Sequence, residues 1–441
     1  MRNQRGKGRA VAALGAVAVS LCTLTALPGQ GARAAEGPRQ HRPDRAESPY
    51  RYDPRAQPVA GAATGRDAPR LAAGAVYRSA LEPGTKAYFQ VDLGATGDAY
   101  VSAVVVPKPD AEVVFGDGIE LTLQDRDGNT CDTGRATFGS PQYPRPVAAY
   151  VSRGTAGHRT SCQTAGPYHL LVRRIGDAAS APGEWGLELR HVREPALTAP
   201  EPTAAPTSWA TASPSAPSPS AHTAHGSTGF ADAPRLGPGA WRDTLRPGTT
   251  LFYRVPVGWG QQLFATADLG RAAGSGYVPH AIDFQLYNPA LGQVADAEMG
   301  YDGTPASVSF PPLPAVAYRN RYSTSGQVGA LRFGGDHYLA VSLSPETART
   351  LGAGPYPVTL RVGVRGRVGP GPAYEGAAPD FAPGGRTTAP AAGPAATGRD
   401  GDSTRMRLLA AAGIGTGTLL VLWAGVRTVV ARRRAGPAGP G

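Results

Sequence analysis

The sequence predicts an all-β protein made of two tandem antiparallel β-sandwich domains with a jelly-roll-like fold, together with one C-terminal transmembrane helix and disordered linkers. Three observations lead to this prediction. Two blocks of the 441-residue chain repeat the same motifs, apolar and polar residues alternate within the matched segments, and Gly and Pro form turns between these segments. Gly (59) and Pro (43) together make about 23% of the chain, close to the low-complexity range, so part of it is not expected to pack into a core.

The N-terminus, residues 1–34, has the pattern of a secretory signal peptide. Basic residues between Arg2 and Arg9 precede an apolar run that ends at Leu27. Ala32-Arg33-Ala34 then supplies the small side chains of a cleavage site. The mature protein is therefore expected to be exported.

The C-terminus is expected to anchor the protein in a membrane. Residues 408–426 form an uncharged stretch of about 19 residues, the length that spans a bilayer as a helix, and the helix is placed at 406–430. The basic tail, 431–441, carries Arg432, Arg433 and Arg434 and should stay in the cytoplasm. The predicted location is the cell membrane, with a single pass, an extracellular body and a cytoplasmic C-terminus.

The net charge of +11 does not predict nucleic-acid binding. Nine of the positive charges lie at the termini, five before residue 35 and four after residue 426. About +2 is left for everything between them, too little for an electrostatic footprint on phosphates.

Composition divides the exported part into two blocks and three connecting segments. A charged, Pro-rich arm is predicted at 35–67, and linkers rich in Pro, Ala, Ser, Thr and Gly at 195–229 and 366–405. The blocks between them, 68–194 and 230–365, each have the size of a typical domain.

The two blocks match at an offset of about 165 residues, which indicates an internal duplication. Five motifs recur in the same order. They are Ala68–Leu71 with Ala233–Leu236, Leu81–Thr85 with Leu245–Thr249, Ile119–Leu123 with Ile282–Leu286, Ala149–Arg153 with Ala317–Arg321, and Gly166/Leu170/Val172 with Gly335/Leu339/Val341.

The matched segments read as strands joined by tight turns. Phe89, Val91 and Leu93 alternate with polar neighbours, as a half-buried strand requires. Pro83-Gly84 and its counterpart Pro247-Gly248 are turn dipeptides. No window in either block has a helical stripe, so each is predicted to be an antiparallel sandwich that folds on its own.

The same motifs resemble the bacterial pre-peptidase C-terminal (PPC-like) domain, a small β-sandwich found on secreted proteins. The resemblance rests on L-x-P-G-T followed by two aromatic residues and x-V, on the central alternating strand, and on the closing Gly with its Tyr/His pair and L-x-V. It covers both blocks. The arrangement is also similar to secreted, membrane-anchored actinobacterial proteins of unassigned role. The resemblance implies non-catalytic modules that serve in secretion or in adhesion to polymers.

The sequence offers no catalytic set. It contains neither a G-x-S-x-G elbow nor H-E-x-x-H, and His41, His222 and His225 fall in the predicted arm and linker. His169 and His337 are interpreted as strand residues. No enzyme activity and no cofactor are expected.

Asp125, Asp127 and Asn129 have the D-x-D-x-N opening of a calcium loop. The sixth position is Thr130 instead of Gly, and the twelfth is Ala136 instead of Glu. An ordinary Asp-Gly turn is the favoured interpretation, with a single Ca²⁺ as the alternative.

Cys131 and Cys162 are the cysteines that remain after cleavage of the signal peptide, and both fall in the first block. In an exported chain they predict a disulfide.

Five residues are candidates for binding. Trp259 lies in a predicted turn, where its indole is either a platform for a sugar or a partner or is folded over the sandwich edge. Tyr150 with Arg153, and Tyr318 with Arg321, either form a repeated surface site or are core tyrosines beside solvated arginines.

The predicted function is a non-catalytic cell-surface protein whose modules bind another secreted or surface protein or scaffold the envelope. The alternative is binding of glycan or cell wall, which should show as a flat cluster of exposed aromatic side chains. A secreted hydrolase is the third possibility, and it would need a pocket with converging titratable groups.

Overall fold

The computed structural model describes residues 50–155, 161–176, 183–212, 220–379 and 381. The predicted signal peptide, transmembrane helix and tail lie outside these ranges. Within the described part of the chain, no helix has the length and apolar character needed to cross a membrane. Everything below concerns the unit that begins at Ser48.

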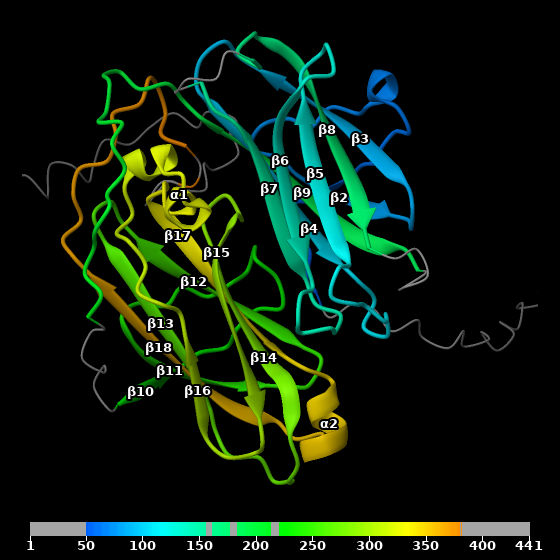
Figure 1. Ribbon diagram of the computed structural model, residues 1–441, viewed down its shortest axis with the longest axis vertical. Helices are drawn as coiled ribbons and strands as arrows, with labels where there is room; N and C mark the ends of the chain where they lie inside the picture. Colours follow the sequence, from blue (N-terminus) through cyan, green and yellow to red (C-terminus); the bar gives the residue numbers. More distant parts are fainter. Residues whose placement is uncertain (1–49, 156–160, 177–182, 213–219, 380, 382–441) are drawn as a thin grey trace, which may run out of the picture. The chain divides into compact units, whose positions relative to one another are not determined.

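The first repeat is a β-sandwich of two sheets (Figure 1). One sheet has the order β1-β2-β9-β4-β7 and the other β3-β8-β5-β6. The strands of the first sheet, in chain order, are β1 (Gln57–Pro58), β2 (Val76–Leu81), β4 (Asp98–Val106), β7 (Val147–Arg153) and β9 (Trp185–Glu194). Those of the second are β3 (Lys86–Leu93), β5 (Gly118–Gln124), β6 (Thr130–Thr137) and β8 (Gly166–Ile175).

The second repeat has the same design, with sheets β10-β11-β18-β13-β16 and β12-β17-β14-β15. The strands of the first of these sheets are β10 (Ala221–Thr223), β11 (Gly239–Leu245), β13 (Gln262–Leu269), β16 (Ala306–Ser309) and β18 (Tyr356–Arg365). Those of the other are β12 (Thr250–Val257), β14 (Val278–Tyr287), β15 (Gln293–Tyr301) and β17 (Gly335–Leu343). The short helices are η1 (Gly65–Asp67), η2 (Tyr318–Tyr322), α1 (Gly326–Ala330) and α2 (Glu346–Leu351).

The identical strand order shows the duplication in three dimensions, and the all-β prediction is confirmed. Four of the five motif pairs occupy equivalent places. For example, Leu121 pairs with Val172 in the first repeat as Phe284 pairs with Val341 in the second. The turns also agree, since Gly84 and Gly248 both have positive φ, at 68° and 74°.

The fifth pair, Ala149–Arg153 with Ala317–Arg321, is not equivalent, so this part of the prediction was wrong. Ala149 to Arg153 belong to β7, whose topological counterpart is β16. Tyr318 to Arg321 lie beyond β16 in η2. A short sequence match placed a helical turn opposite a strand.

Strands that face a single core alternate buried and exposed side chains, whereas β4 and β14 are buried on both faces over most of their length. All nine residues of β4 are buried, and so is every residue from Ala281 to Tyr287 in β14. Their second faces belong to clusters that combine both repeats. One cluster joins Val104, Val106 and Ala148 to Phe252, Tyr287 and Tyr338, and another joins Tyr100 to Phe333. The repeats therefore pack against each other through one sheet of each, a contact that the sequence did not predict. Independent folding of each repeat stays a prediction.

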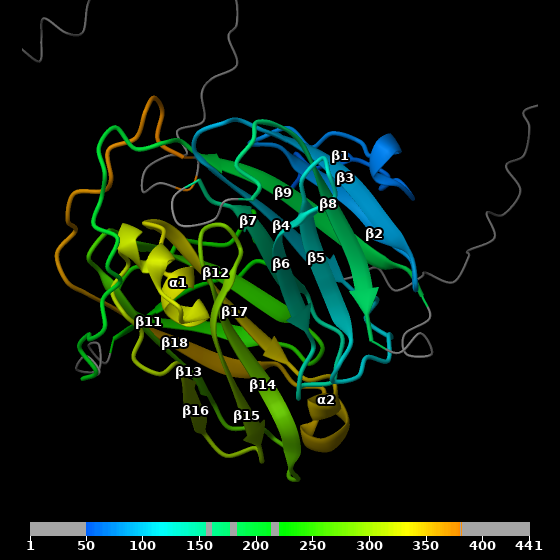
Figure 2. The ribbon, with the colours of Figure 1, turned by 45° about the horizontal axis from the view of Figure 1, so that its top comes forward.

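Parts of the predicted arm and linkers are ordered. Tyr50 is buried, and β1 pairs in parallel with β2. β10 pairs in the same way with β11 and places His222 beside Trp241, 5.2 Å between ring centroids. Figure 2 shows β1 beside β2 and β3. These short strands were missed because the polar, Pro-rich sequence around them gives no periodic signal.

The segment after β18, residues 366–379 and 381, is called the C-terminal strap. Its backbone bonds to the segment after β9, with Thr198 N donating to Ala373 O at 2.9 Å and Glu375 N donating to Ala196 O at 2.7 Å. Phe381 is buried against Phe333, 4.8 Å between centroids. Up to this residue, the segment predicted as a linker is part of the folded body.

Candidate functional site

The predicted binding residues Tyr150, Tyr318 and Arg321 meet at the contact between the repeats, whereas Arg153 is buried within the first. The arginines were expected either in a repeated surface site or as solvated residues beside core tyrosines. Both interpretations were wrong, because the side chain of Arg321 is 4% exposed and Arg153 is 2% exposed. Tyr150 packs on the mixed aromatic cluster around Tyr100. None of these residues forms a repeated surface site.

Arg321 is the centre of a buried charge cluster. Its guanidinium donates to Asp98 at 2.7 Å and to Glu194 at 2.9 Å, both from the first repeat. The ring of Tyr318 lies 3.4 Å from the guanidinium carbon. Tyr374 of the C-terminal strap donates to Glu194 at 2.8 Å. One arginine therefore joins both repeats and the strap.

The pKa values of Arg321 and of the tyrosines that bond Glu194 are raised, which keeps the arginine charged and the tyrosines neutral. Burial opposes the charge on Arg321, but the neighbouring Tyr100 and Glu194 raise its pKa overall. The pKa of Tyr374 is raised by burial and by the charge of Glu194. The hydroxyls of Tyr100 and Tyr374 donate to Glu194, and Arg321 supplies one positive charge against the two carboxylates of Asp98 and Glu194.

A second buried ion pair connects the repeats near β14. Arg145, in the loop before β7, donates to Asp283 at 2.6 Å and to the carbonyl oxygens of Pro141 and Phe138 at 2.7 Å each. The side chains of Arg145 and Asp283 are 3% and 6% exposed. The residue equivalent to Asp283 in the first repeat is Glu120, which pairs with the half-exposed Arg173. The position is thus an outward-facing carboxylate in both repeats, and Arg145 covers it in the second.

An open cleft of about 550 Å³ adjoins this ion pair and is lined by both repeats. The register of β14 and β15 places Asp283 opposite Glu298 and Gln285 opposite Asp296, on one face. Burial, together with the charges of Asp283 and Glu298, raises the pKa of Asp296. From the first repeat, Arg135 lines the cleft and Phe115, 62% exposed, lies at its edge. In this cleft, polar side chains of both signs from the two repeats converge on accessible space.

Trp259 does not present an open platform. Its ring packs between Gly334 and Gly371 of the strap, so closely that a Cβ at either glycine would collide with the indole. Its carbonyl oxygen accepts from Gly369 N at 2.8 Å. Of the two interpretations of Trp259, the structure agrees with the indole folded over the sandwich edge.

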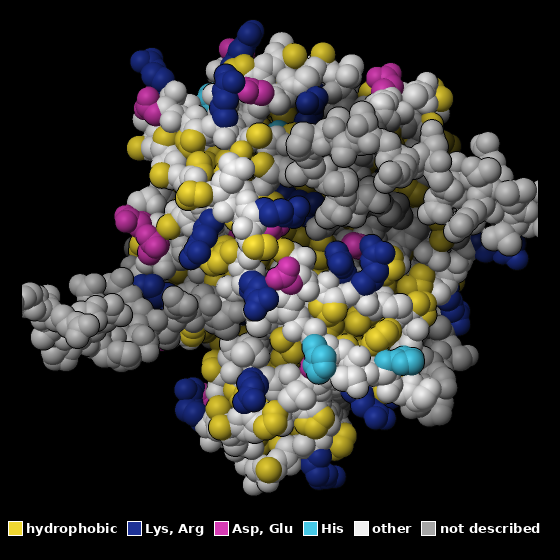
Figure 3. Space-filling view, turned by 180° about the vertical axis from the view of Figure 1, so that it is seen from behind, with side chains coloured by type: hydrophobic (Ala, Val, Ile, Leu, Met, Phe, Trp, Pro, Cys, Tyr) yellow, Lys and Arg dark blue, Asp and Glu magenta, His cyan; other side chains and the backbone are white. Residues whose placement is uncertain are grey.

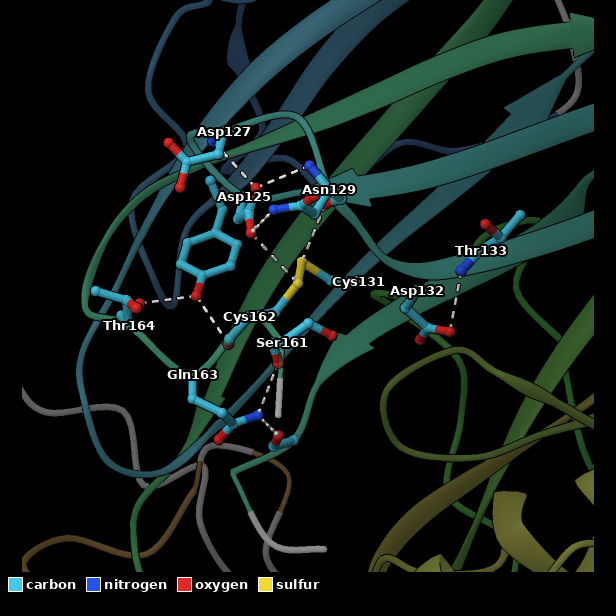
Figure 4. The surroundings of a disulfide bond; sticks show 12 residues. Asp125, Asp127, Asn129, Cys131, Asp132, Thr133, Ser161, Cys162, Gln163 and Thr164 are labelled. Carbon is cyan, nitrogen blue, oxygen red and sulfur yellow. Dashed lines mark hydrogen bonds between the residues drawn. A yellow bond between two sulfur atoms is a disulfide. The ribbon is translucent and has the colours of Figure 1, made fainter. Parts of the chain in front are cut away.

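The loop at Asp125 is a turn closed by its own hydrogen bonds (Figure 4). One carboxylate oxygen of Asp125 accepts from the backbone N–H groups of Asp127 and Asn129, and the other accepts from the Asn129 side chain at 3.0 Å. Gly128 has φ of 86°, as such a turn requires. In the part of the chain that is described, no group of three or more His, Cys, Asp or Glu side chains is placed to hold a metal ion.

The predicted disulfide between Cys131 and Cys162 is confirmed. It closes a loop of 31 residues, which on the chain-entropy model stabilises the protein by roughly 3 to 4 kcal/mol. Because the repeats share buried clusters, we expect a reductant to lower the unfolding midpoint of the whole chain. Calorimetry with and without reductant checks this. A lowered midpoint for one transition beside an unchanged second transition would show that the repeats unfold separately.

Two of the described histidines are buried, and a third pairs with an acid at the surface. His337 and His191 are buried, and the Nε2 atom of each lacks a hydrogen-bond partner. His280 pairs with Glu298 at 3.0 Å at the surface. On the face shown in Figure 3, Lys and Arg side chains are spread among hydrophobic and acidic ones and form no continuous stripe.

No family model matches the sequence, and the search of curated proteins finds no significant match. Among solved structures, a chain from the Sulfolobus Turreted Icosahedral Virus is 10% identical over 65% of this chain and about half (54%) of its own length, with a TM-score of 0.17. The CBM22-1–CBM22-2 tandem of Xyn10C from Paenibacillus barcinonensis is 9% identical over 68% of this chain and 93% of its own length, with a TM-score of 0.18. The tandem CBM51 modules of Sp3GH98 from Streptococcus pneumoniae SP3-BS71 are 10% identical over 66% of this chain and 83% of their own length, with a TM-score of 0.16. Scores of this size establish neither a shared fold nor a shared ligand.

Proposed function

We propose that the chain is a non-catalytic, membrane-anchored cell-surface protein whose two β-sandwiches form one rigid body for binding another protein or scaffolding the envelope. The observation that carries this proposal is the seam between the repeats. Two buried arginine clusters and two mixed apolar clusters fix the repeats together and leave a polar cleft at their junction.

A fixed cleft suits recognition because its polar groups are already positioned, which reduces the entropy lost on binding. The charge of Asp283 is neutralised by Arg145, but Asp296 and Glu298 have no arginine or lysine partner in the described structure. We therefore propose a protein surface with basic side chains as the ligand of the cleft. As a further part of the proposal, each repeat is a PPC-like module, because the motifs that carry this resemblance lie on equivalent strands and turns of two β-sandwiches.

Binding of glycan is the second candidate, and one observation favours it. Phe115 is exposed beside the polar side chains of the cleft, and an aromatic ring next to amide and carboxylate groups can stack on a sugar. Against it, Phe115 and Tyr277 are the exposed aromatic residues among the described large hydrophobic side chains, and they lie on different repeats. A flat aromatic face is not present in that part of the chain.

The cleft is tested by crosslinking membranes that carry the tagged full-length chain and recovering its partner. The double variant Asp296→Lys/Glu298→Lys is expected to reduce recovery at least tenfold, whereas Asp110→Lys, a similar change at another exposed acid, is not. Equal recovery from both variants would exclude the cleft. Binding of cell-wall glycan by the wild type, lost in the double variant, would support the second candidate instead.

The proposed topology makes a separate prediction. Protease added to intact protoplasts is expected to remove residues 68–365 and to leave an epitope placed after Gly441 intact, because the membrane shields the tail. Immunoblots of both regions provide the measurement. Survival of the body under conditions that digest a known surface protein would contradict the proposal.

A further inference from the structure

A wide groove of about 1140 Å³ lies at one edge of the first repeat, separate from the cleft. β2 from one sheet and β3 from the other form its walls, and the turn between them closes one end. The segment from Pro58 to Ala63 crosses from β2 to β3 and closes the other end.

Both walls carry backbone groups without a strand partner. Val59 N donates to Arg78 O at 2.9 Å, so the backbone groups of Arg78 point away from β9. Because backbone groups alternate along a strand, the N–H and C=O of Ala80, two residues after Arg78, also point away from β9. Ala62 and Tyr88 exchange two hydrogen bonds, so the backbone groups of Lys86 also point into the groove. Among the described residues, no strand lies against Ala80 or Lys86 on this side.

The groove already accepts an extended chain at one end. β1 adds to β2 in parallel over two residues, and the chain then leaves toward β3. Beside the long side chains of Glu82, Lys86 and Glu184, six of the lining residues are Gly or Ala and let a backbone approach closely. They are Ala60, Gly61, Ala63, Ala80, Gly84 and Ala87.

The second repeat is sealed at the equivalent place. Asp243, in the register position of Ser79, accepts from Gly226 N at 2.6 Å and from the hydroxyl of Tyr253 at 2.7 Å. Tyr253 occupies the register position of Phe89, which has no hydroxyl. These two differences between the repeats remove the seal in the first one.

The geometry points to an extended segment of another polypeptide as the occupant of this groove. The segment adds a short strand along β2 by exchanging hydrogen bonds with the backbone of Ala80. Its small side chains face the groove, and its flanking charges meet Arg78 on β2, Lys86 on β3, and the carboxylates of Glu82 and Glu184. This surface continues the track on which the chain's own β1 is seated, and it is independent of the cleft.

The test uses the full-length protein in detergent micelles and a phage-displayed library of random octapeptides. Enriched peptides are synthesised, and their affinity is measured for the wild type, for Ala80→Pro and for Ala80→Gly. Proline removes the N–H group that points into the groove and leaves the bonds between β2 and β9 in place, whereas glycine keeps the donor. We expect at least a tenfold loss of affinity with proline and less than threefold with glycine.

Hydrogen exchange on the wild type gives a readout that does not depend on a variant. The amide of Ala80 is expected to exchange rapidly in the free protein and at least tenfold more slowly with a selected peptide bound. Slow exchange in the free protein, no enriched peptide, or equal affinity of Ala80→Pro and Ala80→Gly would each overturn the inference. Self-association abolished by Ala80→Pro would do the same, because a second copy of the chain would then be the occupant.

Discussion

Replacing Arg321 with alanine is expected to lower the free energy of unfolding by about 3 to 5 kcal/mol. The variant leaves the carboxylates of Asp98 and Glu194 without their cation, and their side chains are only 9% and 1% exposed. It also removes a link between the repeats. Urea denaturation of wild type and variant, followed by circular dichroism, measures the loss.

Two comparisons separate this effect from a general loss of charge. Arg349→Ala breaks an exposed pair with Glu346 and is expected to cost less than about 1 kcal/mol. The triple variant Arg321→Met/Asp98→Asn/Glu194→Gln removes both the cation and the stranded charges, and it should recover much of the stability lost in Arg321→Ala. A cost for Arg321→Ala no larger than that for Arg349→Ala would contradict the role assigned to the cluster.

The second large effect is a loss of stability in acid caused by His337. Burial lowers the pKa of His337 to about 4, below the usual value of about 6.5. The unfolded chain therefore takes up a proton at a higher pH than the folded chain does. Above pH 6.5 His337 is neutral in both states, and the free energy of unfolding is unaffected by its titration. As the pH falls from 6.5 toward 4, the free energy of unfolding decreases by about 3 kcal/mol in total.

His337→Phe removes this titration and retains an aromatic ring, which the first repeat carries at the equivalent position as Tyr168. The free energy of unfolding is measured between pH 7 and pH 4.5 for both proteins. The decrease should be smaller in the variant, and the exposed His225→Asn should behave as the wild type. Parallel pH profiles for wild type and His337→Phe would show that the ring titrates normally. Glu188 acts in the opposite direction, because burial raises its pKa and thereby favours the folded state at low pH.

The fold could be predicted from the sequence where local signals are strong. Pro-Gly turns, alternating strands and the repeated motifs specify two sandwiches, and the cysteines specify the disulfide. The association of the repeats gave a weaker signal. β4 reads Asp-Ala-Tyr-Val-Ser-Ala-Val-Val-Val, an almost continuous apolar run that is typical of a strand buried on both faces. That run was the available clue that the repeats pack against each other.

The charge clusters could not be predicted in the same way. Asp98, Glu194 and Arg321 are far apart in the sequence, and nothing local distinguishes them from solvated surface charges. Arg321 was singled out through a repeat match that the topology contradicts, and it was interpreted as a surface or solvated residue instead of the buried centre of this cluster. Asp283 gave a clearer signal, because it stands between Ile282 and Phe284 in a strand where most residues are apolar.

The C-terminal strap also determines how the body would bear mechanical load. If residues 408–426 are inserted in a membrane, tension from the anchor reaches the strap before it reaches β18. The load falls first on the packing of Phe381 against Phe333, then on the backbone bonds that join Ala373 and Glu375 to the segment after β9 and on the bond from Tyr374 to Glu194. Traction from the membrane side is therefore transferred to the first repeat as well as the second, and it acts at the seam that holds the two together.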